Sequence, residues 1–177
     1  MDLPRALEAF STFEKRAMAF YRRLGSRFQD PPGASPLWIE MSNAEAAHFA
    51  VVTLAQDWIH GKGAPPPPLP EMTQASLDAL AQRFRILERR AEADHLTLAD
   101  AVELAMEWEA TELPPVLALV SAIPHEAAQR LRAGLLNEAA SHYRCLKELA
   151  ALAGVTSLDS RLDALRKTAA DAARTSA

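Results

Sequence analysis

The sequence has little of what several classes of protein require. Its single cysteine, Cys145, cannot form an intrachain disulfide, which fits a reducing compartment. Glycine occurs only 6 times, and β-branched runs are few, so a turn-rich β fold is disfavoured. The net charge of -4 comes without a basic stripe interleaved with aromatic residues, which argues against nucleic acid as the main partner.

Other absences narrow the location and the chemistry. No hydrophobic run approaches the length of a transmembrane helix, and the first sixteen residues have scattered charges in place of a signal peptide's apolar core. Neither a glycine-rich phosphate loop nor a Ser/His/Asp order with a recognisable nucleophile elbow is present. We therefore expect a cytoplasmic protein with no membrane partner, and hydrolase or nucleotide-binding functions have little support.

The composition favours helices. Hydrophobic residues make up 49% of the 177 residues, and Ala, Leu, Glu and Arg are abundant. The chain length fits one domain. We predict an all-α fold, a single domain over 1–177, in which a four-helix bundle has a long crossover connection containing a helix, plus a C-terminal helix. The expected core helices cover about 4–28, 36–60, 97–123 and 124–153, the crossover 61–96, and the last helix 157–175.

Local signals support these boundaries. Pro4 suits a first helical turn, and Ser35 before Pro36 is a plausible N-cap. Thr97 is a good N-cap with Asp100 three residues on, and Pro114 and Pro115 should kink the third core helix just past Glu112. Within the crossover, four consecutive prolines predict an extended linker, followed by a helix over about 76–94.

Each core helix has an apolar seam at spacings of 3 and 4 that polar residues interrupt. Such a seam is typical of a bundle with a common core. A buried carboxylate without a partner costs several kcal/mol, so these residues need pairing, hydrogen bonds or a metal. The interrupted seams are Leu7, Phe10, Glu14, Ala17, Tyr21, Leu24, Phe28; Trp38, Met41, Glu45, His48, Val52, Ala55, Ile59; Leu98, Val102, Ala105, Glu109, Glu112, Val116, Leu119, Ile123; and Ala128, Leu131, Leu135, Glu138, His142, Cys145, Leu149, Leu152.

The turns predict that these polar residues meet at one level. Antiparallel helices align residues that lie equally far from their turn. Midway between Glu14 and the Glu45/His48 pair lies the turn at Asp30 and Pro31, and a second midpoint, for the other two helices, falls at Pro124. Together the helices would supply five carboxylates and two imidazoles, and two divalent or trivalent cations would neutralise most or all of the negative charge. These ligand types suit iron or manganese better than zinc.

The constellation resembles the ferritin-like di-iron carboxylate proteins, in which two helices each give a Glu and two others each give a Glu-x-x-His. Phe13 to Tyr21 followed by Glu45-Ala46-Ala47-His48 is similar to the first half of a rubrerythrin-type bundle, and Glu109 with Glu112 resembles the additional carboxylate of that family. The resemblance implies two iron ions, with manganese possible, that react with peroxide or dioxygen, and it suggests a homodimer. The implied metal ligands are Glu14, Glu45, His48, Glu109, Glu112, Glu138 and His142, and the implied catalytic residue is Tyr21.

Two alternatives to an enzyme stay open: non-catalytic iron binding or storage, and a metal-free bundle that acts as an interaction module. The chain has no rubredoxin-like Cys-x-x-Cys pair, so an enzyme would need a separate electron donor. Tyr21 has a core-packing role as its alternative. We expect Cys145 to be an inert buried thiol and Glu107 to point outward. Core or interface packing is expected for Trp38, Trp58 and Trp108. A solvated face, paired in part with Glu88 and Glu92, is expected for Arg83, Arg85, Arg89 and Arg90.

Overall fold

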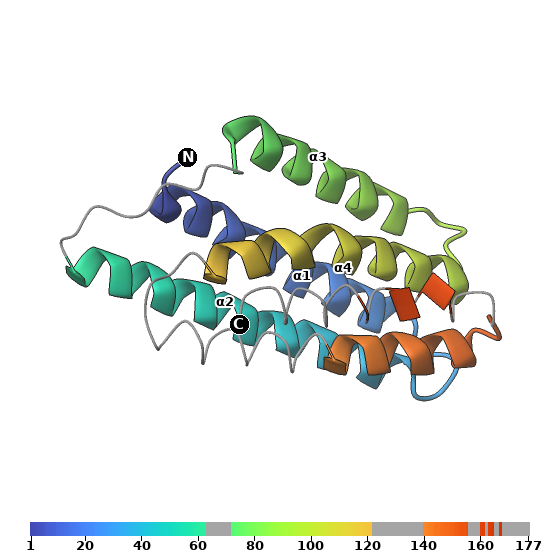
Figure 1. Ribbon diagram of the computed structural model, residues 1–177. Helices are drawn as coiled ribbons and strands as arrows, with labels where there is room; N and C mark the ends of the chain where they lie inside the picture. The colour runs from blue at the N-terminus through green and yellow to red at the C-terminus, as the bar shows by residue number, and fades with distance from the viewer. Residues whose placement is uncertain (63–71, 122–139, 156–159, 162, 165–166, 168–177) are drawn as a thin grey trace.

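The computed structural model describes residues 1–62, 72–121, 140–155, 160–161, 163–164 and 167. These residues form long helices that run side by side, and the described part of the chain has no β-strand (Figure 1). The predicted all-α class is therefore confirmed.

The first helix, α1, spans Leu3–Arg27, close to the predicted 4–28. The side chain of Asp2 caps it by accepting a hydrogen bond from the backbone N–H of Arg5 at 3.0 Å, and a proline stands in the first turn. Its whole predicted seam is buried, including Glu14 and Tyr21. The carboxylate therefore lies inside the fold, as the seam predicted.

The second helix, α2, spans Ala34–Lys62 and begins two residues before the predicted start at Pro36. Ser35 therefore lies inside the helix, and the predicted N-cap is wrong. Gly33 precedes the helix with a φ of +101°, a conformation that residues with a Cβ rarely adopt, so the turn uses glycine to enter the helix. The polar seam positions Glu45 and His48 are buried.

The helix in the crossover, α3, spans Gln74–Ala91, and the next, α4, spans Leu98–Ser121. Before α4, Thr97 Oγ1 accepts a hydrogen bond from the Asp100 N–H, and Asp100 Oδ2 accepts one from the Thr97 N–H. This reciprocal box confirms the predicted start. The helix continues through Pro114 and Pro115, and the kink expected just past Glu112 stays a prediction.

The fourth predicted core helix, 124–153, is described from residue 140, and residues 140–152 are helical. His142, Cys145 and Leu149 of its seam are buried, but Leu152 is 40% exposed, so its predicted core position is wrong. Leu152 is the last helical residue and lies next to Gly33, where the chain leaves the helix in a turn. Glu138, the proline-rich linker and nearly all of the predicted helix 157–175 lie outside the described residues.

Ion pairs attach α3 to the outside of α1 and α4 (Figure 1). The Arg16 guanidinium donates two hydrogen bonds to the Glu88 carboxylate, at 2.9 and 2.8 Å. On the other side, Arg83 and Arg90 pair with Glu107 of α4, which points outward as predicted. The arginines of α3 thus face a solvated surface. Their predicted pairing with Glu88 and Glu92 is not seen, because arginines of α1 take these partners: Arg16 pairs with Glu88 and Arg23 with Glu92.

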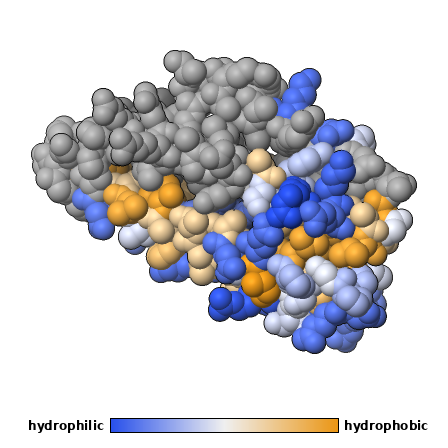
Figure 2. Space-filling view, turned by 90° about the horizontal axis from the view of Figure 1, so that it is seen from below, coloured by the Kyte–Doolittle hydropathy of each residue, from blue (hydrophilic) through white to orange (hydrophobic). Residues whose placement is uncertain are grey.

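Large hydrophobic side chains at the surface are few among the described residues. Ile39, Leu54 and Leu152 are exposed, and on the face drawn in Figure 2 the coloured hydrophobic areas are interrupted by hydrophilic side chains. In the described part of the chain, no helix is both long and apolar enough to cross a membrane.

Candidate metal centre

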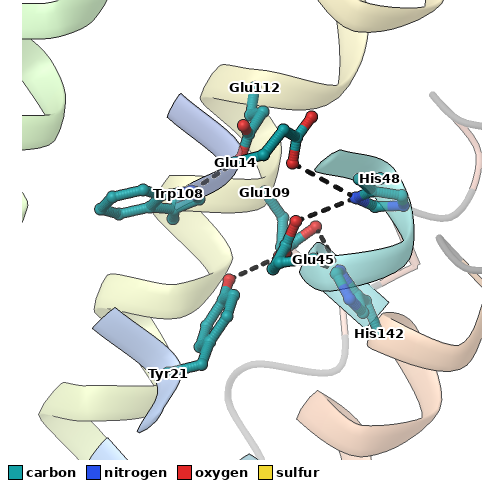
Figure 3. Close-up of polar contacts among 8 residues, drawn as sticks. All are labelled: Glu14, Tyr21, Glu45, His48, Trp108, Glu109, Glu112 and His142. Atoms are coloured by element: carbon teal, nitrogen blue, oxygen red, sulfur yellow. Dashed lines mark hydrogen bonds and ion pairs between the residues drawn. The ribbon is translucent and has the colours of Figure 1, made fainter. Parts of the chain in front are cut away.

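Polar side chains from four helical segments gather in the middle of the bundle (Figure 3). Each is at least nine-tenths buried, although burial of a charge or a polar group without partners is costly. The buried set comprises Glu14, Glu45, His48, Glu109, Glu112 and His142.

A first ligand group joins α1 to α2. It consists of Glu14, Glu45 and His48, and each residue offers an oxygen or nitrogen within 4.8 Å of the other two. His48 Nδ1 lies 2.9 Å from Glu45 Oε2 and 3.6 Å from Glu14 Oε2. The i, i+3 spacing on α2 puts both of its residues on one helix face, so the group follows from the sequence pattern.

A second ligand group joins α2 and α4 to the segment 140–152. Glu45, Glu109 and His142 again offer atoms within 4.8 Å of one another. His142 Nδ1 lies 2.9 Å from Glu109 Oε2 and 3.6 Å from Glu45 Oε1. Residues widely separated in the sequence therefore meet at the level that the turn positions predicted.

Glu45 belongs to both groups, and its two oxygens face different histidines. Oε2 is the oxygen next to His48, whereas Oε1 is the oxygen nearer to His142. Figure 3 shows this carboxylate between the two imidazoles. Glu45 therefore presents one oxygen to each ligand group.

Tyr21 contacts the second group through Glu109. Its hydroxyl, fully buried on α1, donates a hydrogen bond of 2.5 Å to Glu109 Oε1. Burial, and then the negative charge of Glu109, raises the pKa of Tyr21 well above its usual value. The phenol therefore keeps its proton next to a candidate ligand.

Glu112 lies beside the two groups and belongs to neither. The indole Nε1–H of Trp108 donates to Glu112 Oε2 at 2.7 Å. Burial raises the pKa of Glu112 well above its usual value, and the negative charge of Glu14 is the next cause. Of the seven predicted ligands, five thus form the two groups, Glu112 is adjacent, and Glu138 is outside the described residues.

Burial and neighbouring charges shift the pKa values of the remaining cluster residues in different directions. Burial raises the pKa of the Glu14 carboxyl to about 8. Burial also opposes ionisation of Glu45, but His142 and His48 outweigh it and hold the pKa of Glu45 below its usual value. Burial disfavours a charged His142, yet Glu109 and Glu45 raise its pKa. Ion pairs with histidines thus stabilise the charged form of only some carboxyls in the cluster.

Several buried atoms of the cluster are left without a hydrogen-bond partner among the described residues. Both oxygens of Glu14, Oε1 of Glu112 and Nε2 of His142 are in this position. Buried oxygens of this kind normally find a donor, a water or a cation. The combination of carboxylates, imidazoles and unpartnered oxygens fits hard or borderline divalent ions. The residues can therefore hold metal, and their chemistry leaves its identity open.

Comparison of the chain with protein-family models, with curated proteins and with solved structures gives no match. The site is therefore interpreted from its own residues.

Trp108, expected from the sequence to pack in the core or at an interface, also donates a hydrogen bond to Glu112 that was not predicted. A signal was present, because residues four apart lie on one face of a helix, and an indole N–H needs a buried acceptor. Cys145 is a free buried thiol, and burial raises its pKa to about 11. This agrees with the inert thiol that was expected.

Proposed function

We propose that this protein is a ferritin-like, rubrerythrin-type carboxylate protein that binds two iron ions and reduces peroxide or dioxygen. The observation that supports it most is the position of Glu45, shared by two buried groups with one oxygen toward each histidine. A single-ion site or a plain ion-pair network would not require a carboxylate shared in this way.

The proposal assigns one ion to each group. Glu14 and His48 would bind the first ion, Glu109 and His142 the second, and Glu45 both. Carboxylates and imidazoles in this ratio suit iron or manganese. Glu112 and Glu138 complete the proposed ligand set, and two ferrous ions would offset most of the negative charge of its carboxylates.

Reduction of hydrogen peroxide to two waters needs two electrons and two protons. When bound, two ferrous ions would supply one electron each. The described residues enclose the cluster and hold a proton beside it. The cluster is buried, and the Tyr21 hydroxyl, its oxygen 2.5 Å from Glu109 Oε1, donates its proton to that oxygen in a hydrogen bond. A separate reductant would restore the protein after each turnover.

Two other functions compete with this one. Iron binding or storage without turnover would use the same residues. A metal-free bundle acting as an interaction module has an observation in its favour, since both histidines already lie 2.9 Å from a carboxylate oxygen. The oxygens of Glu14 and Glu112 that lack a hydrogen-bond partner among the described residues favour metal over this second alternative.

The test is iron analysis of protein expressed in iron-supplemented medium, followed by anaerobic addition of hydrogen peroxide to the reduced form. We expect about two iron ions per chain, as in related di-iron bundles, and oxidation of both within seconds. Glu45→Gln should lower the iron content of both groups together, because the amide cannot bridge. Glu103→Gln, an exposed carboxylate on α4, is the matched control and should keep the full content.

The outcomes separate the three functions. Bound iron that peroxide oxidises only slowly would indicate storage. Protein that binds neither iron nor manganese tightly would contradict both metal functions and leave the interaction module.

A further inference from the structure

Trp108 is the described residue that connects the outer helix α3 to the candidate metal centre. Its indole is fully buried and lies between two aromatic rings. Phe20 of α1 stacks with it at 4.7 Å between centroids, and Phe84 of α3 stacks with it at 4.3 Å, with interplanar angles of 21° and 19°. Side chains from two other helices therefore hold the plane of the indole.

The fixed indole directs its one donor at Glu112. Nε1–H donates to Glu112 Oε2 at 2.7 Å, while Glu112 Oε1 has no hydrogen-bond partner among the described residues. A carboxylate held through one oxygen has its other oxygen directed by the same bond. In metal sites, such outer hydrogen bonds orient ligands and affect the affinity for the ion.

Resting on the proposed function, we infer that Trp108 is a positioning residue, which holds Glu112 so that Oε1 is available to the ion bound by Glu14, Glu45 and His48. The indole N–H leaves Oε2 occupied and Oε1 open. The aromatic ring of Phe84 makes α3 part of this support, although α3 supplies no residue to either ligand group. Trp108 acts through Glu112 and touches no ion itself.

A matched control exists because Trp38 is the other fully buried indole beside the cluster. It stacks with Tyr21, yet its Nε1 has no hydrogen-bond partner in the described part of the chain. Trp38→Phe and Trp108→Phe remove the same atoms from the core. Only Trp108→Phe removes a hydrogen bond to a candidate ligand.

The experiment titrates Mn²⁺ into metal-free parent, Trp108→Phe and Trp38→Phe protein, with affinity followed calorimetrically and the bound ions followed by electron paramagnetic resonance. We expect Trp108→Phe to lower the affinity for one of the two ions by about 10- to 100-fold, which is the usual effect of losing a residue that hydrogen-bonds to a metal ligand. Trp38→Phe should bind both ions as the parent does. Equal affinities in all three proteins would overturn the inference.

A double-mutant cycle keeps the test decisive if Trp108→Phe perturbs folding. When Trp108 acts through Glu112, adding Trp108→Phe to Glu112→Ala should not weaken Mn²⁺ binding further. Additive losses would show a general packing effect and overturn the role assigned to Trp108. A parent protein that binds neither Mn²⁺ nor, in the iron analysis, iron would overturn the proposed function and, with it, this inference, whereas a parent that binds two ions isolates the role of Trp108.

Discussion

At the scale of single residues, the cluster holds carboxyls whose burial favours the neutral form. Glu14 is the clearest case, since burial raises its pKa to about 8, far above its value in an unfolded chain. Between about pH 4.5 and 8, the folded state therefore keeps a proton on this carboxyl that the unfolded chain has already released. The raised pKa values of Glu112 and His142 act in the same direction. Glu45, whose pKa is lowered, has the opposite effect, but only in acid below about pH 4.5.

We therefore predict that the metal-free protein loses stability as the pH rises from 5 to 8. The loss should be on the order of 3 kcal/mol in the free energy of unfolding, because each pH unit across such a gap contributes up to about 1.4 kcal/mol. Urea unfolding of chelator-treated protein at several pH values measures it.

Glu14→Gln should make this pH dependence shallower, since the amide cannot ionise. Glu8→Gln, at an exposed position of the same helix, should leave it unchanged. A metal-free protein that becomes more stable toward pH 8 would contradict the protonation of Glu14.

At the scale of the elements, helix α4 carries Trp108, Glu109 and Glu112, so its first turn affects the site. Thr97 and Asp100 close that turn by reciprocal hydrogen bonds, with Asp100 N–H to Thr97 Oγ1 at 3.1 Å. We predict that Thr97→Ala lowers the free energy of unfolding by about 1 kcal/mol, the usual cost of losing an N-cap.

A suitable control is Thr53→Ala on α2. The hydroxyl of Thr53 donates only to the carbonyl of Phe49, which already accepts within the helix, so its loss should cost less than about 0.5 kcal/mol. Urea unfolding compares the two variants, and equal losses would argue against a capping role.

The elements also show what the sequence could predict. The seam of α1 has strong helical periodicity, and every predicted polar position on the seams of α1 and α2 is buried. Side-chain pairs between helices are a different matter, because many partners are possible for each charge. Arg16 and Glu88 are 72 residues apart, and nothing local in the sequence specifies that pair.

The candidate site also has a part that the sequence could predict and a part that it could not. The position of Glu45 and His48 on one face followed from their spacing, and the turn positions predicted that Glu14 would meet them. That Glu112 would lie outside both ligand groups, held by Trp108, depends on rotamers and on the aromatic rings of two other helices. Spacing places a residue on a face, but it does not determine where its carboxylate points.

At the scale of the whole molecule, two cations would connect four helical segments. We predict that excess Mn²⁺ raises the melting temperature of the metal-free protein, with a stabilisation of about 2.7 kcal/mol at one hundred times the dissociation constant for one site. Because the ligands must lose protons to bind, the increase should be larger at pH 8 than at pH 6. Differential scanning calorimetry measures both.

Mg²⁺ serves as the control ion, since it prefers oxygen ligands and retains its water, and the two histidines suit it poorly. An equal stabilisation by Mg²⁺, or one that does not grow with pH, would indicate nonspecific screening of the acidic cluster. The homodimer and the separate electron donor stay predictions.

The shared position of Glu45 also has a consequence for the order in which the protein forms. The first group lies within the pair α1 and α2, which a short turn connects, so its loop-closure entropy is small. The second group depends on contacts of high sequence separation: Tyr21 and Glu109 are 88 residues apart, and Ser141 reaches Glu40 across 101 residues. During synthesis from the N-terminus, the first ligand group can therefore assemble while the second is still incomplete. We expect a nascent chain to offer a mononuclear site first, and Glu45 to become a bridge only when the segment 140–152 docks.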